Sequence, residues 1–136
     1  MSEQQFGSFE EFWPHYVRAH TNPTNRRLHF VGTSLAMACV ASAALFRRPL
    51  LLLAAPVVGY GFAWVGHFGF EKNTPATFGN PLYSLRADFV MWSKMVNGTM
   101  DAEVERYATP EPTVTPPHAE PKDANGVHAD VTVTAN

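Results

Sequence analysis

The sequence predicts an all-α membrane protein with an antiparallel transmembrane hairpin, an N-terminal interfacial helix and a third, C-terminal helix. Two uncharged segments, 30–46 and 49–70, support this prediction. An uncharged run of about 18 residues or more is long enough to cross a bilayer as a helix. The second run reaches that length, and the first does so when Leu28 and His29 are added. Two buried helices of a soluble bundle are the alternative, but a chain of 136 residues is too short to cover two such helices on every side.

The first expected helix begins near Ser8, because Ser8 and Glu11 have the spacing of a capping box. Pro14 is expected to kink this helix or to limit its length. Aromatic residues recur along one face, at Phe9, Phe12, Trp13 and Tyr16. Tryptophan and tyrosine are common where a bilayer meets water, so the helix is predicted to lie in the headgroup region.

The short basic turn Arg47–Pro49 joins the two apolar runs and makes them a hairpin. The first helix of the hairpin follows a turn signal at Asn22–Pro23. Asn25 is expected to cap it, and it then extends from near Arg26 to about Phe46. The sequence therefore predicts that the second apolar helix returns alongside the first.

Gly59, Ala63, His67 and Glu71 are spaced four apart in the second apolar helix and so form one row. Small residues in such a row let two membrane helices approach closely. His29 and His67 lie at nearly equal distances from the basic turn, roughly 27–30 Å at about 1.5 Å per residue. Their imidazoles are therefore predicted to lie close together, at the same membrane depth.

A third helix is expected from Asn80–Pro81, which suit the cap and first turn, to about Asn97. Asp88 falls on its apolar face, where a carboxylate needs a partner. That partner is expected to be the histidine site or an arginine such as Arg26 or Arg27.

Composition divides the chain into a helical membrane domain with a metal site, residues 1–107, and a disordered tail, residues 108–136. Residues 110–121 hold five prolines and few large apolar residues, a composition typical of disorder. The net charge of −2 gives no reason to expect a nucleic acid as a partner. Oligomeric state has no signature in the sequence.

Basic residues are more frequent at the histidine end of the hairpin than at its turn. Arg47 and Arg48 lie at the turn, and five lie at the other end: Arg18, Arg26, Arg27, Lys72 and Arg86. The positive-inside rule then predicts a multi-pass protein whose histidine end faces the cytoplasm.

His20, His29 and His67 are expected to collect at that end, with Glu71 one turn beyond His67. Ionisable groups at membrane depth are costly and usually functional, which favours a metal site over three structural histidines. Imidazole and carboxylate ligands with open positions suit non-haem Fe(II) and also zinc, and spacing alone does not choose between them. The single cysteine, Cys39, excludes thiolate cages and iron–sulfur clusters.

Two segments of the chain resemble a known family. HTNPTNRRLHFVGT, residues 20–33, and GYGFAWVGHFGFEKNTPATFGNPLYSLRADF, residues 59–89, are similar to the Mpo-type 2-hydroxy fatty acid dioxygenases, small membrane proteins with many bacterial members. The resemblance covers about residues 8–100. It implies an Fe(II)-dependent dioxygenase of fatty acid α-oxidation, which shortens a 2-hydroxy fatty acid by one carbon with O2. For a bacterial member, the inner membrane is the expected location.

The same resemblance implies site residues. The family's histidines correspond to His20, His29 and His67, and its acidic residue corresponds to Glu71. These four residues are therefore the expected catalytic and metal-binding residues, with Asp88 as a second-rank metal ligand.

Arg26, Arg27 and Lys72 are expected to hold the substrate carboxylate by charge-assisted hydrogen bonds, with phospholipid headgroups as the alternative ligand. Two other functions fit the same residues. One is a zinc-dependent hydrolase of lipids with Glu71 as general base. The other is a non-enzymatic membrane protein in which the histidines and acids form a structural polar network.

Overall fold

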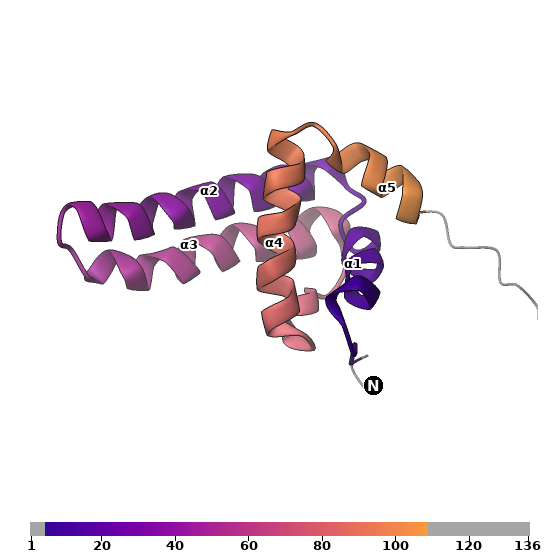
Figure 1. Cartoon of the computed structure of the whole chain (residues 1–136), viewed down its shortest axis with the longest axis horizontal. Coiled ribbons are helices and arrows are strands. Elements are labelled where there is room, and N and C mark those ends of the chain that lie inside the picture. Colours follow the sequence, from indigo (N-terminus) through magenta and orange to yellow (C-terminus); the bar gives the residue numbers. More distant parts are fainter. Residues whose placement is uncertain (1–4, 109–136) are drawn as a thin grey trace, which may run out of the picture.

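A computed structural model describes residues 5–108, which fold into helices and connecting turns without a strand (Figure 1). The helices are α1 (Phe9–Arg18), α2 (Pro23–Leu45), α3 (Leu50–Val65), α4 (Pro81–Val96) and α5 (Met100–Ala108). A π-helical turn, η1 (Gly66–Glu71), continues α3, and a short 3-10 turn, η2 (Ala76–Phe78), precedes α4. The predicted all-α class is confirmed. The predicted tail lies outside the described residues apart from Ala108, which ends α5.

The start of α1 follows the capping expected at Ser8. The Ser8 hydroxyl accepts a hydrogen bond from the Glu11 amide at 3.2 Å, while the Glu11 carboxylate accepts one from the Gly7 amide at 3.2 Å. Pro14 lies inside the helix, which continues past it to Arg18. The aromatic stripe faces the interior, with Phe12, Trp13 and Tyr16 buried, because α4 and α5 pack against it.

The expected cap of α2 was wrong. Asn22 is the N-cap, and its side chain accepts a hydrogen bond from the Thr24 amide at 2.8 Å. Pro23 then fills the first helical position, where its fixed φ and missing amide are favourable. Asn25 is instead a fully buried residue inside the helix.

The hairpin of α2 and α3 packs closely because glycines lie where the two helices meet. A Cβ atom on Gly32 would lie 2.8 Å from Cβ of Phe62 and 3.1 Å from the carbonyl oxygen of Gly59, which is too close for any other residue. Within residues 5–108, Pro23–Leu45 and Leu50–Glu71 are long and apolar enough to cross a membrane, judged by length and composition.

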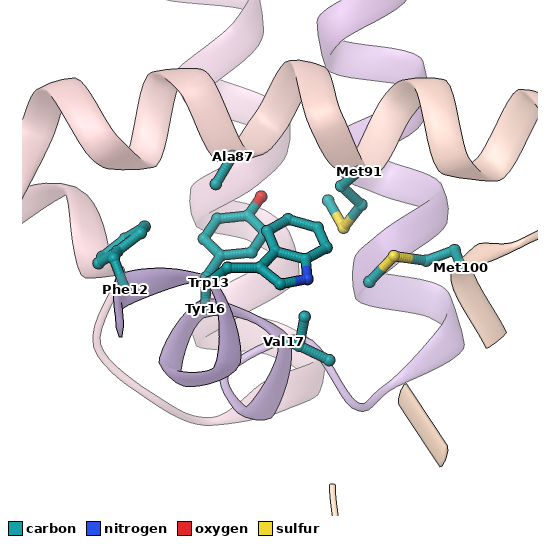
Figure 2. Close-up of a cluster of buried hydrophobic side chains, with 7 residues drawn as sticks. All are labelled: Phe12, Trp13, Tyr16, Val17, Ala87, Met91 and Met100. Atoms are coloured by element: carbon teal, nitrogen blue, oxygen red, sulfur yellow. The ribbon is translucent and has the colours of Figure 1, made fainter. Parts of the chain in front are cut away.

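The remaining helices gather at the end of the hairpin that is opposite the turn (Figure 1). There α4 extends across the hairpin, with its Trp92 ring stacked on Phe30 of α2 and its indole nitrogen donating to Ser34 at 2.9 Å. Helix α5, which the sequence analysis did not predict, packs with α1. We call α1, α4 and α5 together the cap. Its core, in Figure 2, consists of Phe12, Trp13, Tyr16, Val17, Ala87, Met91 and Met100.

Candidate metal centre

Three histidines meet between the cap and the hairpin, and we call them the histidine cluster: His20, His29 and His67. Their exposed fractions are 0%, 4% and 2%. One ring nitrogen from each lies within 4.8 Å of the others, and the ring centroids of His29 and His67 are 5.1 Å apart. The sequence-based prediction that these rings lie side by side is confirmed.

Each histidine reaches the cluster from a different kind of element. His20 lies in the turn after α1, His29 lies in the second turn of α2, and His67 lies in η1. The π-helical turn at His67 adjoins Gly66, where a Cβ atom would lie only 2.0 Å from Oδ1 of Asn25. Gly66 therefore lets the chain that bears His67 approach α2, and such π-helical turns are frequent at functional sites.

The Nδ1 atom of every ring faces an oxygen acceptor. His20 Nδ1 lies 2.6 Å from the carbonyl oxygen of Tyr16, His29 Nδ1 lies 3.0 Å from Oδ1 of Asp88, and His67 Nδ1 lies 2.7 Å from Oδ1 of Asn73. Because these oxygens accept hydrogen bonds, each Nδ1 carries the proton. In the neutral rings the Nε2 lone pairs are left for the centre of the cluster.

This arrangement leaves the centre without a donor. His20 Nε2 and His29 Nε2 lie 3.3 Å apart, and with Nδ1 protonated on both rings one Nε2 could donate to the other only if its ring carried a second proton. Buried lone pairs that face one another are unfavourable unless a cation lies between them. Burial, with the neighbouring His29 and His67, also holds the pKa of His20 well below its ordinary value. A neutral imidazole is the form that binds metal ions, and the three converging rings form a donor set that fits one.

Asp88 lies behind the cluster rather than within it. Its Oδ1 accepts hydrogen bonds from His29 Nδ1 and from the buried Tyr16 hydroxyl. Burial, followed by the charge of Asp88, raises the pKa of Tyr16 well above its ordinary value, so the phenol remains a donor. Asp88 was expected to meet either the histidine site or an arginine. In the structure it meets the histidine site through His29. A carboxylate in this place fixes the tautomer and orientation of a metal-binding histidine.

Glu71 is close to the cluster in sequence, but it does not join it. Its carboxylate accepts hydrogen bonds from the Thr21 amide at 2.9 Å and from the Thr21 hydroxyl at 2.7 Å. It also accepts from the Asn22 amide at 2.9 Å and from Asn25 Nδ2 at 3.2 Å. Glu71 therefore ties η1 to the turn that follows His20.

The basic residues expected at the substrate have other surroundings. The Arg26 guanidinium donates to the carbonyl oxygens of His20 at 3.0 Å and Thr21 at 2.7 Å, and to the carboxylate of Asp101 at 2.9 Å. Arg27 and Lys72 are exposed.

A largely apolar cavity of about 520 Å³ begins at His29 and Asp88 and lies between α2, α3 and α4. Neither Arg26, Arg27 nor Lys72 lines it. Its walls consist of His29, Thr33, Ala36, Met37, Val40, Ala41, Ala55, Pro56, Gly59, Tyr60, Leu85, Asp88 and Phe89. Within residues 5–108 the Thr33 hydroxyl, one turn after His29, has no hydrogen-bond partner.

Sequence reasoning did not identify Tyr16, Asn73 or Thr33 as parts of the site. The spacing of Thr33, four residues after His29 on the same helical face, was a usable signal. Tyr16 contacts His20 through its backbone carbonyl and Asp88 through its hydroxyl, and Asn73 acts from a turn. No local pattern reveals such contacts.

One of three comparisons with known proteins found a match, to a protein family. The model of the family described as 2-hydroxy-palmitic acid dioxygenase Mpo1-like matches residues 6–100, which include the whole histidine cluster and its Nδ1 partners. No curated protein and no solved structure matches the chain.

Proposed function

The chain belongs to the 2-hydroxy-palmitic acid dioxygenase Mpo1-like family, and from this we propose that it is an Fe(II)-dependent dioxygenase that shortens 2-hydroxy fatty acids by one carbon. The single observation that supports the proposal best is the convergence of three buried imidazoles in the histidine cluster. Three buried rings, each with Nδ1 directed to an oxygen, present their Nε2 atoms to a common point. A purely structural polar network would instead pair its donors with its acceptors.

His20, His29 and His67 would hold the iron, and Asp88 and Asn73 would orient two of these rings. When bound, the iron supplies the redox chemistry that makes O2 reactive toward an organic acid. Three protein ligands leave open positions, which is the usual condition for substrate access to a catalytic metal. Glu71 takes part in this proposal as the residue that fixes the turn carrying His20.

The cavity supports a fatty acid as substrate. Its polar end lies at His29, Asp88 and Thr33, and the remainder is formed largely by apolar side chains. A 2-hydroxy acid with its head at the cluster would place its acyl chain in the apolar part, which removes that chain from water. The Thr33 hydroxyl is free to donate to an oxygen of the head.

The atoms of the proposed reaction balance with O2 as the only co-reactant. The bond between C1 and C2 of the substrate breaks, C1 leaves as carbon dioxide, and C2 becomes the carboxyl carbon of the shorter acid. The electrons lost by C1 and C2 are those that one O2 accepts. One oxygen atom of the reactants leaves as water.

The surface of the hairpin supports a location in a membrane. In the most apolar window of Pro23–Leu45 only 17% is buried within the protein, and in that of Leu50–Glu71 only 22% is buried. Neither helix therefore resembles the core helix of a soluble domain. Lipid would cover what the protein leaves exposed. The excess of basic residues at the cap end would then place the histidine cluster at the cytoplasmic face of a bacterial inner membrane, where the exposed Arg27 and Lys72 suit anionic headgroups.

The test combines elemental analysis of anaerobically purified protein with oxygen uptake on 2-hydroxypalmitate. We expect bound iron, and oxygen uptake that yields the acid with one carbon fewer. The variant His67→Ala should lose both, whereas His15→Ala, which changes a half-buried histidine outside the cluster, should keep both. Size-exclusion chromatography and circular dichroism verify that each variant is folded.

Three results would overturn the proposal. Bound zinc without oxygen uptake would point to the lipid hydrolase, and protein without metal would point to the structural network. Full iron content and activity in folded His67→Ala protein would exclude the histidine cluster as the metal site.

A further inference from the structure

We propose that the cavity beside His29 measures the acyl chain, so that the small residues along it set the longest 2-hydroxy fatty acid that the protein accepts. This inference rests on the proposed function. It adds the part of the substrate that is recognised and the residues that recognise it.

The lining residues of α2 form a single row that leads away from the histidine cluster. His29, Thr33, Ala36–Met37 and Val40–Ala41 follow one another at intervals of three to four residues, which is the spacing of one helical face. The row spans about 18 Å from His29 to Ala41 at a rise of about 1.5 Å per residue. The cavity is therefore elongated along the hairpin, with His29, Thr33 and Asp88 toward one end.

Small side chains create this space. Ala36 and Ala41 line it from α2, and Ala55 and Gly59 line it from α3. At Gly59 a Cβ atom would already lie 3.6 Å from Cβ of Ala36, so the two helices are in contact beneath the cavity. Ala36 is half-buried and Ala41 is exposed, and both line the cavity, so a larger side chain at either position would reduce the volume of the cavity at that level.

The crossing of α4 explains why one end of the row suits the head of the substrate. Leu85, Asp88 and Phe89 of α4 line the cavity, and Figure 1 shows that α4 crosses the hairpin toward the end opposite the turn between α2 and α3. Toward the turn the hairpin has no helix over it. An amphiphile would therefore place its polar end under α4 and its tail in the cavity along α2 toward Ala41, the last residue of α2 that lines it.

The position of each residue along α2 sets the acyl length at which its substitution should act. Ala36 lies about 10 Å and Ala41 about 18 Å from the level of His29. Ala36→Leu should therefore limit the acyl chain to a shorter maximum length than Ala41→Leu. Ala38 is the matched control, because it is exposed on the same helix and does not line the cavity.

The experiment supplies the wild-type protein and the variants Ala36→Leu, Ala41→Leu and Ala38→Leu with a mixture of saturated 2-hydroxy acids from octanoate to stearate, and measures the product ratios by mass spectrometry. In Ala41→Leu we expect the ratio of 2-hydroxystearate turnover to 2-hydroxyoctanoate turnover to fall roughly tenfold or more, because the last few methylene groups of the longer chain no longer fit in the cavity. In Ala36→Leu the fall should begin at shorter acids. The ratio in Ala38→Leu should equal that of the wild type.

A second readout does not depend on activity. A 2-hydroxy acid with a photoreactive group near its tail should label residues 40–41 and 55–56 in metal-free protein, and this labelling should fall in Ala41→Leu but not in Ala38→Leu. Equal labelling of all faces of α2 would overturn the proposal, as would unchanged product ratios in all three folded variants. Wild-type protein that consumes no 2-hydroxy acid would count against the proposed function instead, and the photolabelling would still decide whether the cavity holds a tail.

Discussion

The two ends of the hairpin differ in what covers them. At the cap end, α1, α4 and α5 bury a compact aromatic and methionine core, and the histidine cluster lies directly beside it. Toward the turn, leucines and valines such as Leu53 and Val57 remain 69% and 72% exposed. One end is stabilised by the protein's own packing, and the other has apolar surface that no described residue covers. The difference suggests that stability and site geometry depend on the cap, while the far part of the hairpin depends on lipid.

The largest expected effect concerns the cap core. Met91 is 1% exposed and lies among Trp13, Val17 and Met100 (Figure 2). Met91→Ala should lower the free energy of unfolding by about 2–5 kcal/mol, because it removes buried contacts and leaves a cavity. Denaturant unfolding in detergent measures this change. Leu53→Ala, at the exposed end, should change it by less than about 0.5 kcal/mol, and equal losses in the two variants would show that the two ends do not differ.

The second prediction tests whether lipid covers the hairpin. Val57→Arg puts a charge near the middle of an exposed apolar surface, and in a bilayer this should cost about 2.5–3.5 kcal/mol of insertion free energy. The fraction of protein that fractionates with membranes on expression should fall. Ala102→Arg, at an exposed position of α5, should leave that fraction unchanged. A soluble, folded Val57→Arg protein recovered in full yield would contradict membrane insertion.

The third prediction concerns how the cap orients the cluster. Asp88→Ala removes the acceptor for His29 Nδ1 and should weaken metal binding about 10- to 100-fold, the usual loss when such a partner is removed. Competition with a chelator of known affinity measures the change. Asp88→Asn retains an acceptor oxygen and should lose less. A folded Asp88→Ala protein with wild-type metal affinity would mean that the hydrogen bond does not orient His29.

Those features that depend on local pattern were predictable from the sequence. The capping pair at Ser8 and the start of α4 at Asn80–Pro81 follow from residue types at fixed spacing, and the meeting of His29 with His67 follows from equal distances to the turn. Features that depend on tertiary contacts were not predictable. Asn25 is of a residue type that often caps helices. Pro23, however, lets the helix begin earlier and leaves Asn25 buried opposite Gly66.

The candidate metal site divides in the same way. Its three histidines could be identified from the sequence, and their hydrogen-bond partners could not. The Tyr16 carbonyl and the Asn73 amide reach the cluster through the path of the chain, which residue type does not encode. Asp88 was expected at either of two partners, because its position on α4 alone does not determine which element it meets.

The smallest expected effect concerns Glu71, which lies between the cap and the hairpin. Its carboxylate accepts hydrogen bonds from the amides of Thr21 and Asn22 in the turn after His20, so Glu71→Gln should destabilise that turn by about 1 kcal/mol, roughly the net value of one hydrogen bond. Because the carboxylate lies outside the histidine cluster, the metal content should remain that of the wild type. Thermal unfolding and elemental analysis of the same preparation measure both quantities. If folded Glu71→Gln protein loses more metal affinity than Asp88→Ala, Glu71 is a ligand after all, and the turn after His20 must rearrange when the metal binds.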